Sequence, residues 1–372
     1  MTVDLSALSI YLCTMSKHSL SARVTVDLAA LTKNYKTLAA LAPKAETAAA
    51  VKGEAYGLGL KPCITALWKA GCRSFFVARP KEGADVRRIL PKTKIYVLDG
   101  FYTGAANYYL KYGLTPALIS AAEAREWAAK GKGAPCAIHV DSGINRVSFP
   151  VEELKTVLAE KLKLKIVLLM SHLASSEEPG NAFNETQRKR FAEARALLPN
   201  VPASLANSSG CFLGKDFTLD LTRPGVALYG GNPLPGKPNP MKPVATLEAR
   251  VLQVRDVPKG EAVGYNSTWR ATRPSKVALL GAGYRDGIPR RMSSVFDGKA
   301  SVWLGGARCP IVGRVSMDMT AVDVTDLDVK RGDFAEFFGH HISLDEAATS
   351  AGTISWELLT HLGSRYDYKY IK

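Results

Sequence analysis

Short, almost uniformly apolar runs alternate with amphipathic stretches from residue 25 to about residue 230. Strands that are buried on both faces of a parallel sheet have this composition. Alternation of such strands with helices predicts a (β/α)8 barrel of the TIM type, with an open doubly wound sheet as the alternative. The expected strands are Thr47–Lys52, Ser74–Arg79, Lys94–Leu98, Thr115–Ser120, Pro135–Val140, Lys165–Met170, Pro202–Ala206 and Pro224–Tyr229.

The stretches between these runs have helical periodicity. Apolar residues recur at spacings of three and four between Leu28 and Leu41, which predicts a helix there. Ser120 and Glu123 have the spacing of a capping box, and this pair predicts the start of a helix over Ala121–Lys130.

A proline-rich segment, residues 232–243, separates this half from a second one with a different pattern. Five prolines make the segment stiff and poor in backbone donors, so we expect a connector. The second half predicts a mostly antiparallel β domain closed by two short helices. Its expected strands are Glu248–Arg255, Lys276–Leu280, Ala300–Leu304, Thr320–Val324 and Phe334–Phe338, and its helices are Leu344–Ser350 and Ser355–Leu362. The expected organisation is an extension (1–20), a barrel with its connector (21–243) and a β domain (244–372).

Composition narrows the class of protein. With 47% hydrophobic and 22% charged residues among 372, the chain is neither disordered nor collagen-like. The longest apolar runs, such as Ile166–Met170, are strand-sized, so no membrane span is expected. Six scattered cysteines without a CxxC pair or metal-ligand spacing indicate reduced thiols, a cytoplasmic location and no metal site.

The net charge of +15 suggests a nucleic acid or an anionic small molecule as the partner. No basic run interleaved with aromatic residues occurs, which disfavours nucleic acid.

Active sites of such barrels lie at the carboxyl ends of the strands. Lys52 ends the first expected strand, where desolvation would depress its pKa and make it a nucleophile for carbonyl groups. A lysine that simply reaches solvent from a strand end is the alternative. The loops after the last two strands offer small residues for a phosphate: Ser208, Ser209, Gly210, Gly225 and Val226. An imine-forming lysine and a phosphate cradle together suggest pyridoxal phosphate.

Nine motifs, in order along residues 24–366, resemble those of alanine racemases. They are VKGEAYGLG (51–59), HVDSGINR (139–146), MSHLASSE (170–177), ANSSG (206–210), RPGVALYGG (223–231), VGYNSTW (263–269), GAGYRDGIPR (281–290), PIVGRVSMDM (310–319) and TISWELLTHLGSR (353–365). This family carries pyridoxal phosphate on a barrel followed by a β domain, so the resemblance implies the same fold and cofactor.

The resemblance also implies roles for single residues. Lys52 would hold the cofactor as an imine and share acid–base catalysis with Tyr265, each on one face of the substrate Cα. His172 and Arg223 would support Tyr265, and Arg223 would bond the pyridine nitrogen, which stays unprotonated because arginine does not give up its proton. The cofactor-binding set would be Lys52, Tyr56, His172, Asn207, Ser208, Arg223, Gly225, Val226 and Trp356.

Substrate contacts and assembly follow from the same resemblance. Arg146 and the backbone of Met317 would bind the substrate carboxylate, with Tyr284 nearby. Arg290 and Asp318 resemble residues of the substrate access channel, and a surface ion pair is their alternative. In the family Tyr265, Tyr284 and Met317 come from the partner subunit, which implies a homodimer with shared active sites.

Several positions depart from the family pattern. His139 replaces a lysine that is often carbamylated and bonds the carboxylate-binding arginine, and Trp356 replaces a tyrosine that caps the pocket. Glu54 and Leu58 replace an Asn and a His beside the lysine. The expected function is interconversion of L- and D-alanine, which would supply D-alanine for peptidoglycan. A racemase of another amino acid such as serine, or a non-catalytic protein that binds pyridoxal phosphate, are the alternatives.

Overall fold

A computed structural model describes residues 21–372, and the expected extension over residues 1–20 lies outside the described part. The chain forms two compact units. Asp27–Val244, together with Tyr370–Lys372, forms the barrel unit, and Ala245–Lys369 with Ser21–Val26 forms the β unit. Among residues 21–372, no helix combines the length and the apolar content that a membrane crossing needs.

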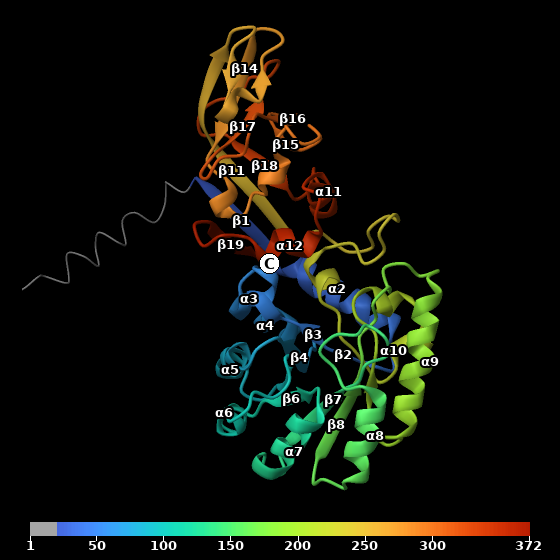
Figure 1. The fold of residues 1–372 in the computed structure, drawn as a ribbon. Helices are drawn as coiled ribbons and strands as arrows, with labels where there is room; N and C mark the ends of the chain where they lie inside the picture. The colour runs from blue at the N-terminus through green and yellow to red at the C-terminus, as the bar shows by residue number, and fades with distance from the viewer. Residues whose placement is uncertain (1–20) are drawn as a thin grey trace, which may run out of the picture. The chain divides into compact units, whose positions relative to one another are not determined.

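The barrel unit is built around parallel strands in the order β3-β4-β5-β6-β7-β8-β9, with helices around their outside (Figure 1). Its strands are β2 (Glu46–Thr47), β3 (Ala49–Ala50), β4 (Ser74–Val77), β5 (Lys94–Val97), β6 (Thr115–Leu118), β7 (Pro135–His139), β8 (Lys165–Met170), β9 (Ala203–Ser204) and β10 (Leu221–Thr222). Its α-helices are α2 (Leu28–Leu41), α3 (Lys52–Tyr56), α4 (Leu60–Lys69), α5 (Pro80–Ile89), α6 (Ala106–Tyr112), α7 (Ala121–Lys130), α8 (Val151–Ala159), α9 (Ala182–Ala196) and α10 (Lys215–Thr218).

Residues 220–224 close the ring of strands. On one side, Asp220 N donates to Ala203 O at 3.1 Å, and on the other, Ala48 N donates to Thr222 O at 2.9 Å. The predicted barrel is therefore confirmed, but its eighth strand was misplaced. Pro224–Tyr229 is not a strand, because Val226–Tyr229 forms the 3₁₀ helix η2.

The core inside the barrel consists of side chains that point inward from successive strands. Phe76 of β4 and Tyr96 of β5 stack with ring centroids 4.7 Å apart, among small residues such as Ala117 and Ala137. Full burial of such a side chain contributes roughly 1.5–3 kcal/mol. The inward-facing core fixes the strand ends at which the site residues lie.

The expected capping box at the start of α7 is half correct. Ser120 Oγ accepts a hydrogen bond from Glu123 N at 3.3 Å. The Glu123 carboxylate, however, accepts from Ile119 N and Phe101 N, both at 3.1 Å. It therefore joins the helix to the loop after β5 in addition to capping α7.

The β unit contains an eight-stranded sheet in the order β14-β17-β16-β15-β18-β11-β1-β19, with β14 also paired to β11, and a separate pair of strands, β12 and β13. Its strands are β1 (Ala22–Asp27), β11 (Ala245–Val257), β12 (Ala262–Val263), β13 (Trp269–Arg270), β14 (Ser275–Leu280), β15 (Ser301–Leu304), β16 (Ala307–Val312), β17 (Thr320–Asp323), β18 (Phe334–Phe338) and β19 (Asp367–Ile371). Its helices are α11 (Leu344–Ser350) and α12 (Ser355–Thr360), with short 3₁₀ turns at Tyr265–Ser267 (η3), Tyr284–Asp286 (η4) and Arg290–Met292 (η5).

The long strand β11 organises this sheet. It pairs antiparallel with β1 and β18, and through its second half with β14. Burial alternates along its first residues, as expected of a strand with one face in a core. This agrees with the antiparallel β domain that the sequence predicts for the second half of the chain.

Candidate functional site

Lys52 lies two residues after the end of β3 and opens an unusual turn. The four residues after it have φ between 56° and 61°, in the left-handed region, and only the first of them, Gly53, is a glycine. Left-handed backbone costs roughly 1–2 kcal/mol for each non-glycine residue, so Glu54, Ala55 and Tyr56 hold strain. The turn closes on itself through a 2.7 Å hydrogen bond from Gly57 N to Gly53 O.

The Glu82 carboxylate binds the backbone of this turn through a hydrogen bond. Its Oε1 accepts from Gly53 N at 2.8 Å, and its Oε2 accepts from Ala78 N at 2.8 Å and Arg79 N at 3.1 Å. Glu82 therefore joins the residue after Lys52 to the end of β4 and the start of α5. Sequence reasoning missed this residue, because a glutamate in the first turn of a helix signals only a cap.

The pKa of Lys52 lies below its ordinary value. The main cause is desolvation by the protein atoms around Lys52 at the carboxyl ends of the barrel strands, which we call the barrel mouth. The positive charge of Arg146 lowers the pKa of Lys52 further. The negative charges of Asp99 and Glu82 act in the opposite direction. Lys52 is nonetheless open to solvent, so a neutral amine there is both more available and within reach of a ligand.

Ser208, Gly225 and Tyr56 form a small polar cradle. Ser208 Oγ accepts from Gly225 N at 2.9 Å and from Ala227 N at 3.2 Å. A Cβ atom on Gly225 would lie 2.3 Å from the Tyr56 hydroxyl, so only glycine fits there. Burial raises the pKa of Tyr56 to about 12, which leaves its hydroxyl protonated and able to donate to an anion. Val226 begins η2 beside this cradle.

Arg223 is a buried cation at the bottom of the site. Its side chain donates to Ser204 Oγ and to Ser171 O, each at 2.5 Å. Within residues 21–372 it forms no ion pair with a carboxylate. Burial lowers its pKa to about 10, so it remains charged at neutral pH. A buried charge without a counter-ion is costly, which suits a ligand that brings an acceptor or a negative charge.

Two histidines near Arg223 are neutral. Burial, followed by the charges of Arg223 and Arg146, lowers the pKa of His139 to about 3. The same causes hold the pKa of His172 well below its ordinary value. Both ring nitrogens of His139 are buried and have no hydrogen-bond partner in the described part of the chain.

Arg146 and Asn207 lie in loops with internal hydrogen bonds. Asp141 Oδ1 accepts from Gly143 N at 2.6 Å and so shapes the loop that presents the exposed Arg146. The Asn207 amide oxygen accepts from Ser176 Oγ and Gly210 N, both at 2.9 Å, which joins its own turn to the loop after β8.

The remaining site residues of the sequence analysis belong to the β unit. Tyr265, Tyr284 and Met317 expose 68%, 43% and 52% of their surface, unusually high values for large apolar side chains. Asp318 pairs with Arg365 at 2.8 Å, as the ion-pair alternative expects, but its partner is not Arg290. Arg290 is exposed on η5, and Trp356 is half-buried on α12.

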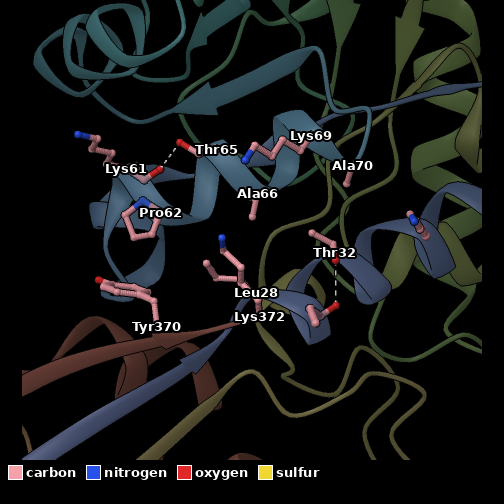
Figure 2. A pocket seen from close by; sticks show the side chains of 12 residues that line it. Leu28, Thr32, Lys61, Pro62, Thr65, Ala66, Lys69, Ala70, Tyr370 and Lys372 are labelled. Carbon is pink, nitrogen blue, oxygen red and sulfur yellow. Dashed lines mark hydrogen bonds between the residues drawn. The ribbon is translucent and has the colours of Figure 1, made fainter.

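A pocket of about 760 Å³ lies elsewhere on the barrel unit, between α2 and α4 (Figure 2). Leu28 and Thr32 of α2 face Pro62 and Ala66 of α4 across it. None of the residues that the sequence singled out for the site lines this pocket. Lys52 and Arg223 belong to the barrel mouth, and this outer pocket has no part in their chemistry.

The barrel mouth thus combines a lysine of lowered pKa, a glycine–serine cradle and a buried arginine, and comparison with known proteins agrees with this arrangement. Residues 26–233 match the family model for the alanine racemase N-terminal domain, and residues 244–370 match that for its C-terminal domain. Alanine racemase from Methylobacterium nodulans is 46% identical over 94% of this chain and 96% of its own length. That from Rhizobium meliloti is 42% identical, with 95% and 97% covered.

A solved structure gives the same result for the fold. The alanine racemase from Bartonella henselae with covalently bound pyridoxal phosphate superposes with a TM-score of 0.90 at 40% identity, over 95% of this chain and 100% of that one. On both domain matches and on these relatives, the chain belongs to the alanine racemase family of enzymes.

Proposed function

We propose that this enzyme interconverts L- and D-alanine with pyridoxal phosphate held by Lys52. The observation that carries the proposal is that Lys52, whose pKa is lowered, and the buried Arg223 lie close enough for both charges to act on the same buried side chain, His172. An electron-poor pyridine nitrogen is an acceptor that Arg223 could bond without transferring a proton. The residues present therefore fit this cofactor.

Other side chains of the barrel mouth would hold the phosphate. The Tyr56 hydroxyl can donate, and the backbone at Gly225 and Val226 can approach an anion closely because Gly225 has no Cβ. Ser208 would contribute its hydroxyl proton, since its oxygen already accepts two backbone hydrogen bonds. When bound, pyridoxal phosphate withdraws electrons from the amino acid and acidifies the hydrogen on Cα.

Racemisation needs a proton-transfer group on each face of Cα. Lys52 would serve one face and Tyr265 the other. The exposed position of Tyr265 on η3 favours its use by a second copy of the chain, in a homodimer with shared sites. His172 and Arg223, which are buried in the barrel mouth, would support Tyr265 there.

The substrate carboxylate would be bound from both sides. Arg146 would supply a charge from the barrel mouth, and the Met317 N–H and Tyr284 of the partner subunit would supply donors. His139 is neutral and has no partner for its ring nitrogens, so it would act on Arg146 only as a hydrogen-bond acceptor. The half-buried Trp356 motivates a test of larger amino acids.

We also propose that the reaction takes place in the cytoplasm and supplies D-alanine for peptidoglycan. Five described cysteines are buried and free, which agrees with a reducing compartment.

The test is incubation of the purified enzyme with L-alanine and pyridoxal phosphate in heavy water, followed by chiral separation. We expect D-alanine that carries deuterium at Cα. Lys52→Ala should abolish this product, and Tyr265→Phe should suppress removal of the L-alanine Cα hydrogen. Lys61→Ala, an exposed lysine on α4, is the matched control and should behave as wild type.

Each outcome decides a separate part of the proposal. Full activity of Lys52→Ala would exclude Lys52 from the reaction, and full activity of Tyr265→Phe would exclude the two-base scheme. If a panel of amino acids shows serine or a larger substrate turning over faster than alanine, the substrate assignment is wrong while the fold and cofactor assignments stand.

A further inference from the structure

Two turns of the β unit carry Tyr284 and Met317, and their backbones are joined directly. Tyr284 N donates to Ser316 O at 2.9 Å, and Arg285 N donates to Met317 O at 3.0 Å. A Cβ on Gly283 would lie 2.3 Å from Ser316 O, so the two turns are in contact with no room for a side chain between them. A shift of one turn would therefore move the other.

Arg365 lies across both turns and binds a carboxylate from each. Its Nε and Nη2 donate to the two oxygens of Asp286, at 2.7 and 3.0 Å. Its Nη1 donates to Asp318 Oδ1 at 2.8 Å. Asp286 ends the turn that Tyr284 begins, and Asp318 directly follows Met317.

The Asp286 half of this arrangement is shielded from water. Asp286 is 5% exposed, and its Oδ2 also accepts from Gly283 N at 2.9 Å. Gly363 N donates to Asp286 O at 3.0 Å, which fixes the segment that leads to Arg365. A guanidinium is planar and carries several donors in fixed directions, so it can serve both carboxylates at once, whereas a lysine ammonium cannot reproduce this geometry.

We propose that Arg365 is a positioning residue for substrate binding. It holds the turn at 283–287 against the turn at 316–319 and thereby sets the placement of Tyr284 and of the Met317 N–H. The inference rests on the proposed function, in which these two groups meet the substrate carboxylate. Arg365 itself touches neither substrate nor cofactor in this scheme.

The test compares Arg365→Gln with Arg308→Gln, each as the full-length enzyme loaded with pyridoxal phosphate. Arg308 is a matched control, because its side chain is 46% exposed, against 45% for Arg365. It binds the Glu346 carboxylate through two nitrogens, as Arg365 binds that of Asp286. We expect Arg365→Gln to raise KM for alanine about tenfold with a smaller change in kcat, and Arg308→Gln to change neither. Arg365→Lys should recover only part of the loss.

Asp318→Asn provides a second route that keeps the buried pair with Asp286. It should raise KM less than Arg365→Gln, and the double variant should be no worse than Arg365→Gln alone. Hydrogen exchange of the apoenzyme gives a readout independent of turnover. Peptides that cover residues 283–290 and 314–320 should both exchange faster in Arg365→Gln and stay unchanged in Arg308→Gln.

Arg146→Gln separates failure of this inference from failure of the proposed function. If Arg146→Gln and Tyr284→Phe raise KM while Arg365→Gln does not, Arg365 has no positioning role. If Arg146→Gln leaves KM unchanged, the assignment of the carboxylate site fails first. If Arg365→Gln and Arg308→Gln change kcat and KM to the same extent, Arg365 contributes only to general stability and the inference is wrong.

Discussion

Replacing Glu82 with alanine should loosen the turn that follows Lys52. A hydrogen bond to a charged acceptor contributes about 1.5–3 kcal/mol. The bond from Gly53 N to Glu82 Oε1 is partly open to water, so we take the lower end, about 1.5 kcal/mol. The left-handed residues 54–56 hold strain of roughly 1–2 kcal/mol each, which favours relaxation once the anchor is lost. At about 1.4 kcal/mol per factor of ten, the present form of the turn becomes about tenfold less favoured.

Titration of pyridoxal phosphate into the apoenzyme measures this effect through the visible absorbance of the bound cofactor. We expect Kd to rise about tenfold for Glu82→Ala and less for Glu82→Gln, whose carbonyl oxygen can still accept from Gly53 N. Labelling of Lys52 by trinitrobenzenesulfonate as a function of pH reports its pKa. Because the charge of Glu82 raises the pKa of Lys52, both variants should lower that pKa further.

Glu153→Ala is the control for loss of a carboxylate that binds the barrel backbone. Glu153 Oε1 accepts from Ala121 N at 2.8 Å, at a different strand end. This variant should lose stability without a change in Kd or in Lys52 labelling. If Glu82→Ala behaves like Glu153→Ala in both assays, Glu82 does not position Lys52.

Three further predictions concern buried titratable groups. Arg223→Leu should abolish racemisation. It should change the free energy of unfolding by less than about 2 kcal/mol, because it removes an uncompensated buried charge. Urea unfolding measures this change, and a much larger loss of stability would contradict the prediction. Since the pKa of His139 is about 3, His139→Gln should leave both limbs of the pH–rate profile in place; a shifted limb would show that His139 titrates. Burial raises the pKa of Glu123 from 4.5 to about 7, so its contribution to stability is complete below about pH 4.5 and falls as pH rises through about 7. The stability difference between wild type and Glu123→Gln, followed by urea unfolding across this range, should therefore decrease with rising pH, and a constant difference would refute the shift.

The sequence predicted best those strands whose environment is uniform. Ser74–Val77 is buried on both faces, as is the second half of Lys165–Met170, so their apolar composition marks them clearly. The eighth strand was misplaced because the closing segment, Leu221–Thr222, is too short to show a period. The apolar run after it is buried for another reason, since it forms η2, where the Leu228 carbonyl accepts a hydrogen bond from Asn34.

Five strands of the β unit were missed, namely β1, β12, β13, β16 and β19, and the last two show why. Ala307–Val312 contains Pro310, and a proline within a run of residues argues against a strand. In the structure the Pro310 side chain is exposed. Asp367–Ile371 is mostly exposed and carries charges, so it lacks an apolar face.

Motifs located the residues of the barrel mouth, whereas their supports left no signal in the sequence. Glu82 and Arg365 act through partners 29 and 79 positions away, Gly53 and Asp286, and such pairs are visible only once the chain has folded. The lowered pKa of His139 likewise depends on its burial in the folded barrel, and after that on the charges of Arg223 and Arg146.

The pairing of β1 with β11 has a consequence for synthesis of the chain. Ala22 lies opposite Ala249, and Arg23 binds Glu248 at 2.7 Å, so β1 finds its partner only after more than two hundred further residues have been made. At about 5–20 residues per second, a ribosome needs roughly 10–45 s for that interval. The segment Asp27–Val244, which is the barrel unit without Tyr370–Lys372, is synthesised in the meantime. During that time β1 has no partner strand, and an unpaired strand can associate with other chains. Protection from aggregation is therefore needed most while the chain is being synthesised.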